Sequence, residues 1–149
     1  MHAIADLLTR AGVETDVVDA VQDAIWEKVL VNVGINAATA LARVDNGLLA
    51  DTDPGARLLA SAVEEAADVA RAEGHAVRDD VVEYVSDVAS ATGSNRSSMR
   101  QDVERGRRTE IERLNGAVVA RADDHDVAVP VNRTLTDLVR LTERGYDAA

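Results

Sequence analysis

The sequence predicts an all-α fold, and three observations lead to this prediction. Apolar residues recur at helical spacing over several long segments, and stretches rich in turn residues separate these segments. No strand-like segment alternates with the helices, and the chain holds no G-x-G-x-x-G turn of the kind that cradles a phosphate. Aromatic residues make up only 2% of the 149 residues and Phe is absent, so Ala, Val, Leu and Ile must fill the core.

The first predicted elements lead into one long helix. Residues 1–10 are expected to form a short helix that ends near Gly12, and residues 13–18 are expected to be extended. A long helical pattern then runs over about residues 19–43. It ends in VDNGLLADTDPG, residues 44–55, which is dense in turn-forming residues.

Two further helices follow this turn. One begins after Pro54, a residue that suits a first helical turn, and ends near Gly74. The next covers about residues 79–90 and is followed by the loop ATGSNRSS. Ser97 or Ser98 in that loop is expected to cap the helix that comes after it.

The last part of the chain is expected to be helical and interrupted. Short helical segments cover residues 99–124, with Gly106 as a break. VAVP, residues 127–130, is a connector, because the residue before a proline is disfavoured in the helical region. A final helix covers about residues 131–144.

The charge of the chain restricts its partners. The formal net charge is −11, and Arg supplies 15 of the 16 basic residues. An acidic surface repels nucleic acid and anionic membranes, so neither is an expected partner. Abundant Asp with almost no Lys resembles proteins of salt-loving organisms, although a GC-rich genome favours the same residues. Both biases tend to remove Lys, so the single Lys at position 28 is informative.

Other features of the composition exclude further classes of protein. The chain has no Cys, so it has no disulfide framework and no thiolate chemistry. Its three His residues lie in separate segments without ligand spacing, so no metal site is expected. No apolar run approaches 18 residues, so no membrane span is expected. The N-terminus lacks a basic start followed by an apolar block, so we expect no signal peptide and a cytoplasmic location.

Three polar side chains fall on one line of the long helix at residues 19–43. With Ile25 at 0° on an ideal wheel, Lys28, Asn32 and Asn36 lie at about 300°, 340° and 20°. The rest of the helix is apolar nearly all round, which is typical of a buried helix. A buried amide without a partner costs about 1–3 kcal/mol, and a buried ammonium costs more. Either the Lys reaches out to water and the two Asn bond to backbone, or all three line a wet cleft for a polar ligand.

A second polar candidate lies in RRTEIERLNG, residues 107–116. With Ile111 at 0°, Leu114 and its apolar neighbours occupy an arc of about 240–340°, and Glu110 falls at about 260°, inside it. Glu112 falls at about 100°, outside it. We therefore expect Glu110 to face inward and Glu112 outward. Glu110 is either a functional acid or a first-turn carboxylate that complements a helix dipole.

These residues belong to longer motifs. The pattern W-x-K-x-x-x-N-x-x-x-N begins at Trp26, and an Asn-Gly pair follows it at Asn46. NRSSMRQDVERGRRTEIERLNG covers residues 95–116, and DVAVPVN precedes the final helix. Together they resemble the helical C-terminal domain of the ketopantoate reductase (2-dehydropantoate 2-reductase) family. The resemblance covers about residues 4–144, with the motifs in the family's order.

The resemblance implies both a fold and a reaction. The family's enzymes reduce the ketone of ketopantoate with NADP or NAD as cofactor, on the way to pantothenate and coenzyme A. The implied fold is a helical bundle of the kind found in the C-terminal domain of 6-phosphogluconate dehydrogenase, and it supplies most substrate-side residues. The implied roles are general acid for Lys28, orienting acid for Glu110, and substrate contacts for Asn32, Asn36, Asn46 and Ser98.

The missing Rossmann domain is the largest departure from the family. Residues 1–18 resemble only the tail of such a domain, and residues 19–149 correspond to the helical substrate and dimerisation domain. We therefore expect a homodimer, no tight binding of a nicotinamide cofactor by this chain alone, and a Rossmann domain supplied in cis or in trans. Two alternatives stay open. One is a non-catalytic helical oligomerisation module with inherited site residues, and the other is a related 2-keto acid reductase with another substrate.

The acidic composition predicts that salt stabilises the fold. We expect a higher melting temperature in molar KCl than in dilute buffer, because like charges repel one another and salt screens the repulsion. Thermal melts across a KCl series measure this. A melting temperature that stays flat or falls with added salt would contradict the halophilic interpretation.

Overall fold

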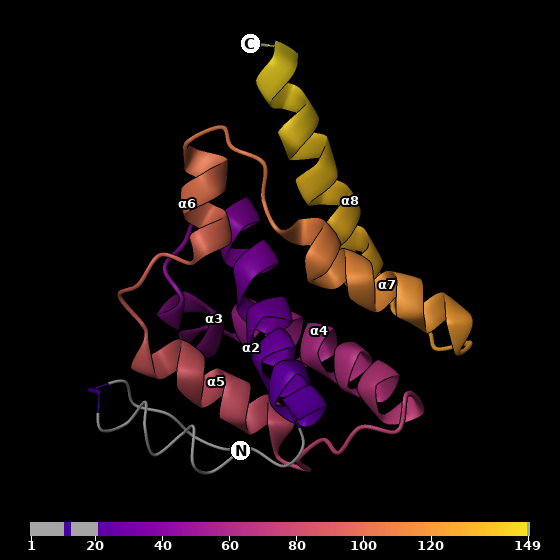
Figure 1. The fold of residues 1–149 in the computed structure, drawn as a ribbon. Coiled ribbons are helices and arrows are strands. Elements are labelled where there is room, and N and C mark those ends of the chain that lie inside the picture. The colour runs from indigo at the N-terminus through magenta and orange to yellow at the C-terminus, as the bar shows by residue number, and fades with distance from the viewer. Residues whose placement is uncertain (1–10, 13–20, 149) are drawn as a thin grey trace.

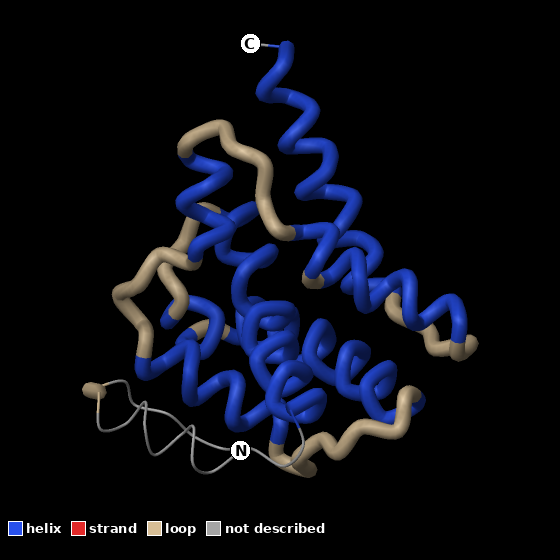
Figure 2. Tube along the Cα trace, viewed as in Figure 1, coloured by secondary structure: helices blue, strands red, loops and turns tan. Residues whose placement is uncertain are grey.

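The computed structural model of the protein describes residues 11–12 and 21–148, and within these ranges it contains helices and no strand (Figure 2). The prediction of an all-α fold is therefore confirmed. The expected helix at 1–10, the extended segment at 13–18 and residues 19–20 lie outside the described residues. The α-helices are α2 (Val21–Ala42), α3 (Gly47–Asp51), α4 (Asp53–Ala72), α5 (Val81–Ala91), α6 (Ser98–Glu104), α7 (Asn115–Asp124) and α8 (Pro130–Arg144), and two short 3₁₀ helices are η1 (Ile111–Arg113) and η2 (Gly145–Ala148).

Helix α2 lies at the centre of the fold, and α4, α5, α6 and α8 pack around it (Figure 1). Its second half is buried on every side, from Val33 through Ala40. Gly34 allows two neighbours to approach closely, because a Cβ there would lie 2.6 Å from Val63 of α4 and 3.0 Å from Val85 of α5. The centre of the core is therefore built from small side chains, as the low aromatic content requires.

The helices around α2 are amphipathic. In α4, α5 and α8 the buried residues recur every three or four positions, which places them on one face of each helix. The opposite faces carry most of the charged side chains. None of the helices in the described part of the chain is both long and apolar enough to cross a lipid bilayer.

Local signals set several helix ends as the sequence predicts. Ser97 caps α6, since its hydroxyl accepts a hydrogen bond from the N–H of Arg100 at 3.1 Å. Pro54 occupies the first turn of α4, whose cap is Thr52. Gly106 adopts a left-handed φ of 62° and separates α6 from η1.

The sequence did not predict α3. Residues 47–51 were assigned to a turn, yet they form a short helix that packs against α4 and α5. Its first N–H groups find partners in a distant loop: the N–H of Asn46 donates to the carbonyl of Asn95 at 3.1 Å, and that of Gly47 to Gly93 at 3.0 Å. A tertiary contact therefore stabilises a helix too short to form by itself.

A buried polar cluster joins α8 to the core. Both carboxylate oxygens of Glu65 on α4 accept backbone N–H groups at the start of α8, from Val131 and Asn132 at 2.9 Å each. The side chain of Asn132, which is fully buried, donates to Glu65 at 2.8 Å and accepts from Asn115 of α7 at 3.0 Å. Glu65 thus satisfies helix N–H groups that have no partner within α8.

Gly55 should tolerate no side chain. A Cβ at Gly55 would lie 2.6 Å from Leu49 Cα and 2.7 Å from the carbonyl oxygen of Leu48, and backbone atoms cannot move aside cheaply. We expect Gly55→Ala to lower the free energy of unfolding by about 1–3 kcal/mol, measured by chemical denaturation. Gly145→Ala is the matched control, because no atom lies within 4 Å of its Cβ position. Equal stability of the two variants would contradict the close approach of α3 and α4.

Candidate functional site

Lys28, Asn32 and Asn36 lie in a row along α2, and their exposure decreases toward its C-terminal end. Lys28 is exposed, Asn32 is half-buried and Asn36 is only 6% exposed. The row spans about 12 Å at a rise of 1.5 Å per residue. The expectation that this helix is buried all round is wrong for its first half, where Ile25 is 49% exposed. The helix leaves the core at that end, so Lys28 reaches solvent.

A narrow hollow forms where the row meets α6. Asn36 lines it together with Ser98 of α6 and Glu110, which precedes η1. Three of the six predicted site residues are therefore close in space. The remaining lining residues are Met99, Asp102 and Leu114.

Glu110 lies at this hollow for a reason other than the predicted one. We expected it on the inward face of a continuous helix, but it is exposed, and no α-helix covers residues 105–114, between the end of α6 and the start of α7. The helical wheel does not apply, because residues 105–110 form a loop and η1 is a 3₁₀ helix. The outward position of Glu112 is confirmed. It forms two hydrogen bonds with Arg140 of α8, at 2.8 and 2.7 Å.

Lys28 lines a separate pocket on the exposed half of α2. This pocket has a volume of about 310 Å³, and its other lining residues are Ala24, Glu27, Val31, Tyr84 and Val88. A hydrogen bond to Glu27 raises the pKa of Tyr84 above its ordinary value, and burial adds to this effect. The guanidinium of Arg78 lies over the Tyr84 ring, 4.1 Å from its centroid. Lys28 therefore lies at a pocket with a largely apolar wall that includes one aromatic ring.

Asn46 lies apart from the other candidates, at the start of α3. Its side chain is 8% exposed and donates to Thr92 Oγ1 at 3.1 Å. The Thr92 hydroxyl itself donates to the carbonyl of Val88 at 2.7 Å, which fixes the direction of the Asn46 bond. The buried Oδ1 of Asn46 has no hydrogen-bond partner among the described residues. This buried oxygen is therefore an acceptor without a donor, next to the loop that precedes α6.

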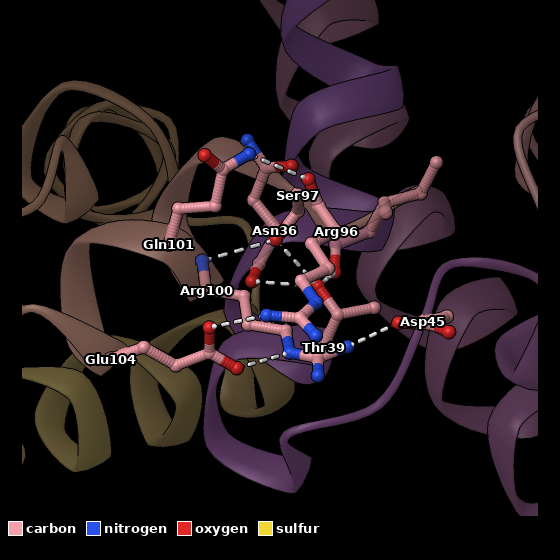
Figure 3. A network of polar contacts seen from close by, with 9 residues as sticks. Asn36, Thr39, Asp45, Arg96, Ser97, Arg100, Gln101 and Glu104 are labelled. Carbon is pink, nitrogen blue, oxygen red and sulfur yellow. Dashed lines mark hydrogen bonds and ion pairs between the residues drawn. The ribbon is translucent and has the colours of Figure 1, made fainter. Parts of the chain in front are cut away.

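A polar network fixes this loop and the start of α6 (Figure 3). The hydroxyl of Thr39 on α2 donates to Ser97 Oγ at 2.8 Å, so the cap of α6 is tied to the central helix. The guanidinium of Arg100 is only 10% exposed and bridges two carboxylates, Asp45 beside Asn46 and Glu104 at 2.8 Å. Figure 3 shows these side chains converging from α2, the segment before α3, and α6. The network holds Asn46 and Ser98 in fixed positions.

Two residues at the site were not identified from the sequence. Asp102 follows Ser98 by four positions on α6, so the helix predicted before Gly106 already places the two residues on one face, and this spacing was the signal that could have identified Asp102. Tyr84 reaches the Lys28 pocket from α5, and no local pattern connects the two. The part of the chain described here contains no cluster of His, Asp and Glu that could hold a metal ion. The ammonium, amides and carboxyl groups of the two hollows suit a small polar ligand that completes their hydrogen bonds.

Comparison with known proteins identifies relatives of this arrangement. The family model described as "Ketopantoate reductase PanE/ApbA C terminal" matches residues 20–143. A 2-dehydropantoate 2-reductase of Halobacterium salinarum is 59% identical over 142 residues, which cover 95% of this chain and 47% of that protein.

Two solved structures also resemble this chain. A PanE/ApbA family ketopantoate reductase from Ralstonia eutropha JMP134 matches with a TM-score of 0.92 at 36% identity, over 98% of this chain and 49% of that one. A D-mandelate dehydrogenase, in a ternary structure with NADH and anilino(oxo)acetate, matches with a TM-score of 0.87 at 28% identity, over 97% and 61%. The chain spans about half the length of the curated relatives it matches.

The Arg100 bridge predicts a pH-dependent stability. A hydrogen bond from Arg100 holds the pKa of Glu104 below its ordinary value. A carboxyl group with a lowered folded-state pKa stabilises the fold fully above its ordinary pKa, and this contribution is lost as the pH falls through the lowered value. We expect wild type to be more stable than Glu104→Gln at pH 7, with a difference that shrinks as the solution becomes acidic.

Denaturant unfolding of both proteins at a series of pH values measures this difference. Glu64→Gln is the matched control, since Glu64 is exposed on α4 and forms no ion pair with the other described residues. A difference between wild type and Glu104→Gln that stays constant from neutral to acidic pH would contradict the role of the bridge.

Proposed function

The chain belongs to the ketopantoate reductase family, and we propose that it is the C-terminal substrate-binding and catalytic domain of an NAD(P)H-dependent 2-dehydropantoate 2-reductase. The observation that carries the proposal is the row of Lys28, Asn32 and Asn36 on α2, which leads to the hollow formed with Ser98 and Glu110. The reaction converts ketopantoate to pantoate for pantothenate and coenzyme A synthesis.

The proposed chemistry centres on the ammonium of Lys28. Nicotinamide, when bound, supplies the hydride that reduces the keto carbon. Negative charge then develops on the ketone oxygen, and a cation beside that oxygen stabilises the charge and gives it a proton. The exposed position of Lys28 on α2 suits this role, because a substrate can approach it from outside the helical domain.

The remaining polar residues are proposed to bind and orient the substrate. Asn32 and Asn36 offer amides along the cleft, Ser98 offers a hydroxyl, and Glu110 orients the substrate and the Lys28 ammonium. Asn46 stays a predicted substrate contact, but its unpaired Oδ1 is buried, so the loop before α6 would have to move before a substrate hydroxyl could donate to it. Ketopantoate carries such a hydroxyl.

A nicotinamide cofactor requires a second domain. Residues 21–148 hold no strand and no glycine-rich strand-to-helix turn, so they do not fit the usual binding site for a dinucleotide. The hollow at Asn36 is too narrow to admit even a water molecule, whereas most ligand pockets measure roughly 300–1,000 Å³, so the complete substrate site is expected to need surfaces from elsewhere. We propose a Rossmann domain, in the same polypeptide or in a separate one, of which residues 1–18 form the end.

The assembly and setting of the enzyme are also part of the proposal. Leu138 and Leu141 of α8 are 45% and 67% exposed, and Leu138 borders an apolar groove between α2, α4 and α8, which supports a homodimer. The relative from Halobacterium salinarum supports a salt-adapted protein. A cytoplasmic location, and the choice between NADP and NAD, stay predictions.

A related 2-keto acid reductase is the second candidate. The likeness to a D-mandelate dehydrogenase favours it, because the structure of that protein contains NADH together with anilino(oxo)acetate. The apolar wall of the Lys28 pocket, with Val31 and Tyr84, suits a bulky substituent next to the keto acid. Comparing ketopantoate with an aromatic 2-keto acid as substrates distinguishes the two candidates.

A fusion protein tests the proposal and the role of Lys28. The half of the Halobacterium salinarum relative that this chain does not cover is placed ahead of the chain, and oxidation of NADPH or NADH is followed with ketopantoate. We expect reduction by the fusion, and a fall in kcat of about 100-fold or more for Lys28→Arg with an unchanged melting temperature. Arg keeps its proton, and its planar guanidinium does not fit where a compact ammonium acted.

Arg57→Lys is the matched control for exchanging the two cations, because Arg57 is exposed on α4 away from the row. It should keep wild-type turnover. A folded Lys28→Arg fusion with near wild-type kcat would exclude the proton-donor role. A folded fusion that reduces neither keto acid would favour the non-catalytic module.

A further inference from the structure

Glu143 of α8 is a buried acid that bonds to the loop before Glu110. It is only 6% exposed, and one of its oxygens, Oε1, accepts two hydrogen bonds from Thr109, from the N–H and from the hydroxyl, at 2.7 Å each. Arg108 approaches the other oxygen at 3.5 Å, but its side chain is 79% exposed. The contacts with Thr109 therefore dominate, since an ion pair that reaches solvent contributes little.

The same hydroxyl connects Thr109 to the residue on the other side of Glu110. Thr109 Oγ1 donates to Glu143 and accepts the N–H of Ile111 at 3.2 Å. The carbonyl of Glu110 itself accepts the N–H groups of Arg113 and Leu114. The backbone of Glu110 is thus fixed before and after the residue by a chain of bonds that starts at Glu143.

The rest of the loop depends on this anchor. Gly106 turns the chain with a left-handed φ, and the N–H of Arg107 closes the turn on the carbonyl of Asp102 at 2.8 Å. From there to η1, Glu143 provides the side-chain anchor among the described contacts. Burying a carboxylate is costly unless donors compensate it, and bonds to an ionised acceptor are about twice as strong as neutral ones.

We infer that Glu143 is a positioning residue, which sets the place of Glu110 at the hollow through Thr109. The consequence for activity rests on the proposed function of Glu110, whereas the ordering of the loop does not. A displacement of a reacting group by about 1 Å can cost about 100-fold in rate, so the anchor matters although Glu143 touches no substrate.

A double-mutant cycle in the active fusion tests the inference. We expect Glu143→Leu, which keeps the bulk and removes the acceptors, to lower kcat by about 10- to 100-fold when Glu110 is present. In a Glu110→Gln background the same change should cost less than about 3-fold, because the positioned group is already disabled. Glu143→Gln keeps an acceptor for Thr109 and should retain most activity. Thr109→Val removes the hydroxyl that donates to Glu143 and should have an effect similar to that of Glu143→Leu.

Hydrogen exchange of the 149-residue chain gives a readout that needs no activity. In Glu143→Leu the amides of Thr109 and Ile111 should exchange at least about tenfold faster, and core amides of α2 should not change. Glu112→Gln is the matched control, because it removes an ion pair with α8 on the far side of Glu110. It should leave both amides and kcat unchanged.

The outcomes separate the inference from the proposed function. Losses of kcat that are equal in both backgrounds would overturn the inference, even in an active enzyme, because Glu143 would then act independently of Glu110. Unchanged exchange at Thr109 and Ile111 of the 149-residue chain would overturn it, whether the fusion is active or inactive. Faster exchange in the 149-residue chain, together with a fusion that reduces neither keto acid, would support the anchoring by Glu143 and reject only the proposed function.

Discussion

The structure depends on the burial of the second half of α2 on all sides. A helix with no solvent face can pack only if every neighbour presents an apolar stripe to it, and α4, α5 and α8 do so. Close approach requires small residues, and Gly34 gives the space that Val63 and Val85 fill. A core with few aromatic side chains is stable here because its helices lie close together.

The same helix also serves the candidate site, because its two halves have different surroundings. The second half is fixed by packing. The first half continues the same helix and carries Lys28 on its exposed face. A helix anchored in this way fixes the backbone position of Lys28, whereas the exposed side chain keeps its rotamer freedom until a partner binds it. Lys28, Asn32 and Asn36 therefore pass from solvent to core along one line, and Lys28, the proposed proton donor, lies nearest to solvent.

Charged side chains fix the segments that packing cannot hold. Arg100 ties the segment before α3 to α6, Glu65 satisfies the start of α8, and Glu143 anchors the loop before η1. Each lies at least half-buried, and each contacts backbone or side chains from a distant element. In a protein with a net charge of −11, these acids and bases are placed where their hydrogen bonds compensate the cost of burial.

The sequence by itself determined the all-α class, most helix ends and the alignment of Lys28, Asn32 and Asn36, because these follow from local chemistry: caps such as Ser97, left-handed glycines such as Gly106, and the helical repeat. The tertiary structure alone decided the rest. The helix α3 forms because a distant loop accepts its N–H groups. The first half of α2 keeps an exposed face, which carries Lys28, because the described elements cover only the side with Trp26 and Leu30. Glu110 reaches the hollow from a loop, where no periodicity applies, and the acid that fixes that loop lies 33 residues further along the chain, beyond the reach of any local pattern.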